Sequence, residues 1–262
     1  MNQSEDATWP QPVTYAFRSA DGSYYNPLMP TMGMAGSPYA RSIPSQRCLS
    51  PAALPPPDLL FDTLLKRDKF VEHPGGISSL FFAFADIIIH NIFDTDPKGW
   101  TANLANSYLD LSPLYGASQK DVNGVRRFDG TGRLLDDVFA DSRLLNMPPA
   151  VGALLILFNR NHNVSFRLPF PSYAVSSSLK YVAEKILCIN ENGKFNNPPH
   201  ADSQAQDEEI FQRARLVNTA FFVQVILRDY VGAILGLVRD GSSWRLDPLM
   251  VNHKDYLLRP PC

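Results

Sequence analysis

The sequence has little net charge and few cysteines. It contains 24 Lys and Arg against 26 Asp and Glu, a formal net charge of −2, which excludes a broad basic surface for nucleic acid or an anionic membrane. Its cysteines, Cys48, Cys188 and Cys262, have neither the even number of a disulfide framework nor the spacing of a metal site. The opening MNQSEDATW lacks the basic and apolar regions of a signal peptide. We therefore expect a reduced, cytoplasmic protein.

Glycine is scarce relative to proline, and no apolar run is long enough for a confident membrane span. There are 15 glycines and 22 prolines, and the prolines cluster before residue 60 and at the C-terminal end. A spanning helix needs about 20 apolar residues, so we expect no transmembrane segment. With 45% hydrophobic residues the chain can still bury a sizeable core. We predict an irregular arm over residues 1–57, followed by a helical body.

The most apolar stretch carries a single histidine. Residues 78–93, SSLFFAFADIIIHNIF, have apolar side chains in every direction, which predicts a helix buried on all sides. His90 lies four residues after Asp86, so the two share one face of this helix. Burying both groups is costly unless they are paired or used. The pattern is consistent with a satisfied core His–Asp pair or with a functional site.

Two polar elements follow this helix. In NLANSYLDLSPLYG, residues 103–116, oxygen donors crowd together at Asn106, Ser107, Asp110 and Ser112, which suits a hard cation such as calcium or a turn with no metal. Arg143 then precedes an apolar core helix that ends in the NRNHN sequence of residues 159–163.

Taken in this order, the motifs resemble the animal-type haem peroxidase and cyclooxygenase superfamily. The resemblance is strongest to the fungal fatty-acid dioxygenases called linoleate diol synthases or psi-factor-producing oxygenases. It covers most of residues 9–248, and the matching segments are FAFADIIIHNIF, SYLDLSPLYG, RLL-x-x-PP-x-VG-x-LL-x-LFNR-x-HN, RDYVGAILGLVR and SSWRLDP. It implies a mainly α-helical domain, a haem cofactor, and an unsaturated fatty acid with O2 or peroxide as substrates.

The resemblance also implies roles for individual residues. His90 would be the distal histidine, which moves a proton between the oxygens of a peroxide. Arg143 would hold a positive charge near bound oxygen or a haem carboxylate. Asp86 stands where cyclooxygenases have glutamine, so His90, Asp86 and Arg143 are the expected cofactor contacts. His162 would join one helix to another.

A calcium site is implied at five positions. Its ligands would be Asn91, where the family usually has aspartate, and Asn106, the carbonyl of Tyr108, Asp110 and Ser112. Because only Asp110 is a carboxylate, we expect weak calcium binding.

The resemblance divides the chain into three regions. The arm of residues 1–57 precedes a dioxygenase domain over 58–248, which we expect to be truncated. Residues 164–180 interrupt a helical pattern. They are therefore either encoded by a retained intron or form an insertion loop. The tail over 249–262 does not resemble the family, and the proximal histidine and radical tyrosine that the resemblance implies are missing from it.

We therefore expect the chain to belong by lineage to the haem-dependent linoleate dioxygenases, which are oxidoreductases of oxylipin biosynthesis. We expect its own activity to be impaired. A non-catalytic remnant and a general haem peroxidase are the alternatives. The resemblance allows oligomers and peripheral membrane association.

Overall fold

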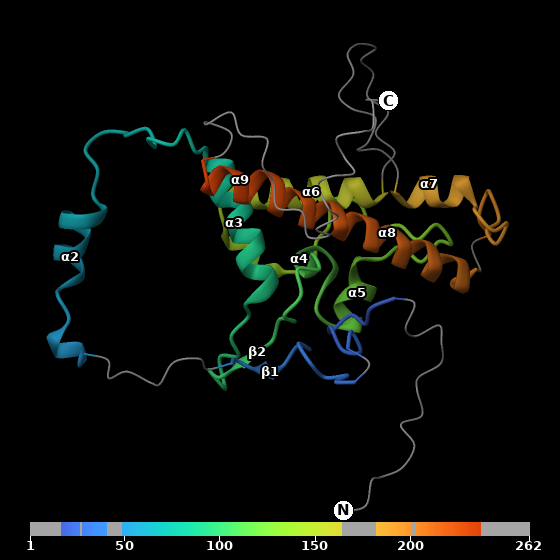
Figure 1. Ribbon diagram of the computed structural model, residues 1–262, viewed down its shortest axis with the longest axis horizontal. Coiled ribbons are helices and arrows are strands. Elements are labelled where there is room, and N and C mark those ends of the chain that lie inside the picture. The colour runs from blue at the N-terminus through green and yellow to red at the C-terminus, as the bar shows by residue number, and fades with distance from the viewer. Residues whose placement is uncertain (1–16, 27, 41–48, 164–181, 201–202, 237–262) are drawn as a thin grey trace, which may run out of the picture.

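The computed structural model describes residues 17–26, 28–40, 49–163, 182–200 and 203–236, and its architecture is mainly α-helical, as predicted (Figure 1). The predicted interruption at 164–180, the SSWRLDP motif and the tail over 249–262 lie outside the described residues. No helix among the described residues is both long and apolar enough to cross a membrane.

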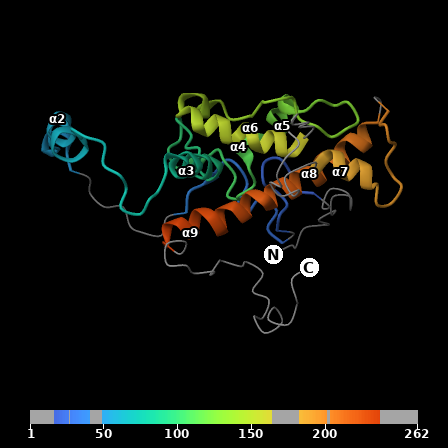
Figure 2. The ribbon, with the colours of Figure 1, turned by 90° about the horizontal axis from the view of Figure 1, so that it is seen from above.

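The body is a stack of crossing helices. Helix α3 (Ser79–Ile92) packs against α6 (Pro149–Asn163), and α6 packs in turn against α8 (Gln204–Val225). Helix α7 (Val182–Ile189) lies along α8, as Figures 1 and 2 both show. The short helices α4 (Ser112–Tyr115) and α5 (Gln119–Val125) lie against this stack.

Three phenylalanines from different helices form the centre of the core. Phe84 of α3, Phe158 of α6 and Phe222 of α8 are buried, and their ring centroids lie 5.5 to 6.4 Å apart. Burial of each such ring contributes on the order of 1.5–3 kcal/mol to folding. The aromatic contacts thereby fix α3, which carries His90, against the two longest helices.

Helix α3 is not buried on all sides, so that prediction was wrong. Its buried residues Ala83, Phe84, Ile87 and Asn91 form one stripe. The opposite side is open to solvent, with Phe82 56% and Ile89 50% exposed. Ser78 begins the helix in an extended conformation, but its side chain makes no capping hydrogen bond.

The segment after the proline-rich arm is only partly helical. Helix α2 (Pro57–Leu60) continues as a π-helical turn over Phe61–Leu65 and stands apart from the body in both views (Figures 1 and 2). Pro56 is the N-cap residue, and no side chain makes a capping hydrogen bond there. Leu59, Leu60, Leu64 and Leu65 are all exposed, so the side that they form has no partner among the described residues.

The remaining elements are short. Strands β1 (Ser37–Pro38) and β2 (Ala102–Asn103) pair antiparallel and tie the arm to the segment after α3. The 3-10 turns span Pro51–Ala53 and Ser142–Asn146. After α8, a π-helical turn at Ile226–Tyr230 leads into α9 (Val231–Ile234). This irregularity includes Arg228, Asp229 and Tyr230, the first residues of the RDYVGAILGLVR segment.

Candidate functional site

His90 lies in the last turn of α3, and its side chain is half-buried. Nδ1 of the ring lies 2.7 Å from the main-chain oxygen of Asp86, one turn earlier. Because a carbonyl oxygen can only accept, Nδ1 donates this hydrogen bond, and in a neutral imidazole Nε2 is then the nitrogen with the lone pair. Nε2 makes no hydrogen bond to the described residues. The ring is therefore held in the tautomer that a proton acceptor requires.

The carboxylate of Asp86 does not pair with the imidazole of His90. It forms no hydrogen bond or ion pair with the residues that the structure describes, and only the main chain of Asp86 contacts the ring. Phe82, Asp86 and His90 follow one another at four-residue spacing, so they share one side of α3. Phe82 and the neighbouring Ile89 make this an open, largely apolar surface beside the imidazole.

A cavity of about 200 Å³ opens next to His90. Polar residues line it, among them Ser112, Asp121, Asp141 and Arg143, together with apolar ones such as Pro113. A water molecule takes about 30 Å³, and drug-sized ligands need about 300 Å³ or more. The cavity can therefore admit several water-sized molecules, and it is too small for a drug-sized ligand.

Arg143 ties the end of α3 to the 3-10 turn that follows α5. Its guanidinium forms a two-atom ion pair with Asp141, with Nη2 2.6 Å from Oδ2 and Nε 2.9 Å from Oδ1. Nη1 lies 2.9 Å from Asp94 Oδ1 and also donates to the main-chain oxygen of Phe93 over 2.9 Å. Nη2 donates to the main-chain oxygen of His90 over 3.2 Å. Arg143 therefore satisfies carbonyl groups at the C-terminus of α3, where a cation is favoured.

The charges of Arg143, Asp94 and Asp141 influence the pKa values of Arg143 and Asp94. Burial would lower the pKa of Arg143, but the hydrogen bonds and charges of Asp141 and Asp94 reverse this effect and raise it. Burial raises the pKa of Asp94, and the charge of Asp141 adds to this, although Arg143 acts in the opposite direction. The guanidinium is thus held as a cation that positions the backbone of His90.

The five residues of the predicted calcium site do meet in space. Asn91 Nδ2 donates to the main-chain oxygen of Tyr108 over 2.6 Å, and Ser112 Oγ lies 3.3 Å from the main-chain oxygen of Asn91. Asn106 Nδ2 donates to Asp110 Oδ2 over 2.8 Å. The backbone N–H of Ser112 donates to Asp110 Oδ1 over 2.9 Å.

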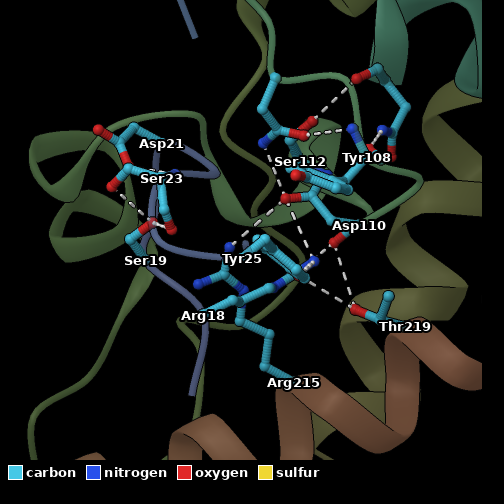
Figure 3. Close-up of polar contacts among 12 residues, drawn as sticks. Arg18, Ser19, Asp21, Ser23, Tyr25, Tyr108, Asp110, Ser112, Arg215 and Thr219 are labelled. Atoms are coloured by element: carbon cyan, nitrogen blue, oxygen red, sulfur yellow. Dashed lines mark hydrogen bonds and ion pairs between the residues drawn. The ribbon is translucent and has the colours of Figure 1, made fainter. Parts of the chain in front are cut away.

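Two arginines that the sequence analysis did not single out converge on this loop (Figure 3). Arg18, from the N-terminal arm, places Nη1 3.2 Å from Asp110 Oδ2 and donates from Nη2 to the main-chain oxygen of Asp110 over 2.6 Å. Arg215, from α8, places Nη2 3.9 Å from the same carboxylate oxygen. Both come from segments far from the loop in sequence, so no local motif reveals them.

These contacts do not fit a calcium ion. The single carboxylate of the set already accepts from two N–H groups and faces guanidinium cations. The amide nitrogens of Asn91 and Asn106, rather than their oxygens, face the remaining acceptors. Within the described part of the chain, no three His, Cys, Asp or Glu side chains cluster closely enough to hold a metal. Asn91 Oδ1 is buried without a hydrogen-bond partner, but one free side-chain oxygen falls short of the about six to eight oxygen ligands that calcium takes.

His162 has the helix-joining role that was predicted. It is fully buried in α6, its Nε2 donates to the main-chain oxygen of Gly132 over 2.9 Å, and its Nδ1 accepts from the hydroxyl of Tyr115 over 2.8 Å. Asn218 of α8 donates to the same hydroxyl oxygen over 2.9 Å. Burial lowers the pKa of His162 to about 4. The imidazole is therefore a neutral link between α4, α6 and α8.

The fold and these motifs together identify the class of protein. The family model for animal haem peroxidases matches residues 17–106 and 98–257, so the chain belongs to the animal haem peroxidase family. Membership implies haem, and with it iron, as the cofactor. A fatty acid alpha-dioxygenase of Arabidopsis thaliana shares the fold, with a TM-score of 0.63 and 19% identity over 86% of this chain and 38% of that one.

Fungal relatives are more similar in sequence. Psi-producing oxygenase A of Aspergillus fumigatus is 44% identical over 245 residues, which are 90% of this chain and 21% of the relative. Linoleate diol synthase of Gaeumannomyces graminis is 40% identical over 252 residues, which are 94% of this chain and 20% of the relative. The chain thus spans about a fifth of the length of the curated relatives that it matches.

Proposed function

We propose that this chain forms the distal side of the haem pocket of a fatty-acid dioxygenase that adds O2 to an unsaturated acid such as linoleate. The names of its fungal relatives support the substrate class, and its family supports the cofactor. The observation that carries the proposal is the position of His90: its Nδ1 lies against the Asp86 carbonyl, and its Nε2, which has no partner among the described residues, lies beside a small cavity.

Each residue of the site has a defined part in this proposal. Haem would lie against the open side of α3, over Phe82 and Ile89, and would supply the iron at which oxygen or peroxide reacts. His90 accepts a proton at Nε2 and can return it, while its Nδ1–H bond to the Asp86 carbonyl keeps the ring oriented. Arg143 holds the last turn of α3 in place and so acts as a positioning residue. We assign no role to calcium.

The experiment measures haem binding and oxygen uptake by the longest product that the gene encodes. This choice is made because the chain matches only about a fifth of the length of its relatives. We expect a saturable haem spectrum with one haem per chain and formation of a linoleate hydroperoxide. His90→Gln should retain much of the haem affinity and lose hydroperoxide formation by about 100-fold or more, because removal of a general base costs on the order of 10²–10⁴ in rate. His73→Gln, at an exposed turn, is the matched control.

The same assay separates the two alternatives. A general haem peroxidase would oxidise a phenol in the presence of peroxide without forming a hydroperoxide from linoleate. A non-catalytic remnant would show neither reaction. Haem binding and hydroperoxide formation that are equal in the wild-type protein and in His90→Gln would refute the assignment of His90.

A further inference from the structure

Arg215 is a buried cation whose hydrogen-bonding capacity is mostly unused. Its side chain is fully buried in α8, and neither Nε nor Nη2 has a hydrogen-bond partner in the structure. Its guanidinium carbon lies 5.3 Å from the ring centroid of Tyr115, and Nη2 is 3.9 Å from Asp110 Oδ2, beyond hydrogen-bond range. Buried donors without acceptors are costly, and a buried charge is more so.

The surrounding charges do not balance. Arg18 and Arg215 both face Asp110, and neither makes an ion pair with any other described carboxylate. Burial and the nearby charge of Arg18 lower the pKa of Arg215 to about 10, so the guanidinium remains charged at neutral pH. The two arginines and one aspartate therefore leave one positive charge in excess, partly shielded from solvent.

A cavity of about 240 Å³ lies against both arginines, between the N-terminal arm and α8. Tyr24, Tyr25 and Gln212 also line it, and these side chains can donate hydrogen bonds. No Asp or Glu appears among the described residues that form its wall. The cavity thus combines excess positive charge, neutral donors and room for a small ligand.

We propose that this cavity is a binding site for a small oxyanion, a carboxylate or phosphate group, which balances the excess positive charge of Arg18 and Arg215. Guanidinium groups match the planar or tetrahedral oxygens of such anions through paired N–H bonds. Arg18 reaches Asp110 O over 2.6 Å and so keeps the arm in position to close the cavity (Figure 3). An anion here would join the arm to α8, and the site is independent of the haem surface of α3.

The test measures thermal unfolding in potassium phosphate, in sodium acetate, and in potassium chloride at matched ionic strength. With an anion at ten times its Kd we expect the Tm to rise by roughly 3–5 °C above the chloride value. Arg215→Met should abolish this rise. Arg213→Met, two residues earlier on α8 and paired with Glu209, should retain it. A response to phosphate alone or to acetate alone identifies which group the site takes.

A second variant keeps the proposal testable if Arg215→Met does not fold. Gln212→Glu puts a carboxylate on the cavity wall without removing a buried side chain, so it should weaken phosphate binding at least tenfold and raise the Tm in chloride. An equal rise of the Tm in phosphate for the wild type, Arg215→Met and Gln212→Glu would show that the rise is a nonspecific effect of salt. That result, or no response to either anion, would overturn the proposal.

Discussion

Nη2 of Arg143 donates a hydrogen bond to the main-chain oxygen of His90 over 3.2 Å, so the arginine holds the histidine by its backbone. The resemblance to haem peroxidases predicted a charge near bound oxygen or a haem carboxylate. In this structure the guanidinium binds Asp141, Asp94 and the last carbonyls of α3. It therefore acts on His90 through the position of the helix end.

Replacing Arg143 should consequently destabilise α3 and misplace His90. For Arg143→Met we expect a loss of about 1–2 kcal/mol in the free energy of unfolding, a moderate value because the side chain is partly exposed and its ion pairs are screened. Urea denaturation measures this loss. Arg160→Met, which breaks the exposed ion pair with Asp137, is the control and should cost less than Arg143→Met, because solvent screens the exposed pair. Equal losses in the two variants would contradict a positioning role.

Chelation of calcium should leave the stability of the protein unchanged. The carboxylate of Asp110 is already neutralised by Arg18 and accepts N–H groups from Asn106 and Ser112, so it offers little to a metal. We expect the Tm in excess EDTA and in millimolar calcium chloride to agree within about 1 °C, because only a ligand that binds the folded state shifts the Tm. Stoichiometric calcium binding by calorimetry would contradict the arginine-filled arrangement.

Local sequence features located much of the candidate site. The apolar run over 78–93 predicted the helix that carries His90, and the oxygen-rich run over 103–116 predicted a loop whose polar residues meet. The partners of that loop could not be found in this way, because Arg18 and Asp110 lie 92 residues apart and only the fold brings them together. The orientation of the side-chain amides of Asn91 and Asn106 also depends on tertiary contacts.

Burial was the least predictable property. Helix α3 is apolar on every side, but packing covers only the side that faces α6 and the core. The leucines of α2 are likewise exposed. Apolar periodicity shows which residues favour burial, and it does not show which other segments are present to cover them. The domain boundaries at 57 and 248 stay predictions.

The glycine of the Asp21-Gly22 turn should be essential for docking the N-terminal arm. Gly22 has φ +81°, and a Cβ there would lie 2.7 Å from the Cβ of Asn106. Gly22→Ala therefore combines backbone strain with a clash, and we expect a loss of about 2–4 kcal/mol. Gly36→Ala is a matched control in the same arm, with φ +83° and no atom within 4 Å of a Cβ. Thermal or urea unfolding that shows equal losses would rule out the close contact.

The buried imidazole of His162 should make the protein sensitive to mild acid. Its folded-state pKa of about 4 lies below the ordinary value of 6.5, so between these two pH values the unfolded chain binds more protons than the folded chain. Stability should therefore be complete above pH 6.5 and fall as the pH drops toward 4, by up to about 3 kcal/mol in total.

His162→Gln tests this because glutamine can still donate to Gly132 and accept from Tyr115, but it does not titrate. We expect the variant to be less stable at pH 7, since its shape differs, and to have a flatter dependence of unfolding free energy on pH between 6.5 and 4. Urea unfolding at a series of pH values measures both. Because the carboxylates are the same in the two proteins, parallel curves would show that His162 is protonated without cost and that its buried link is not maintained in solution.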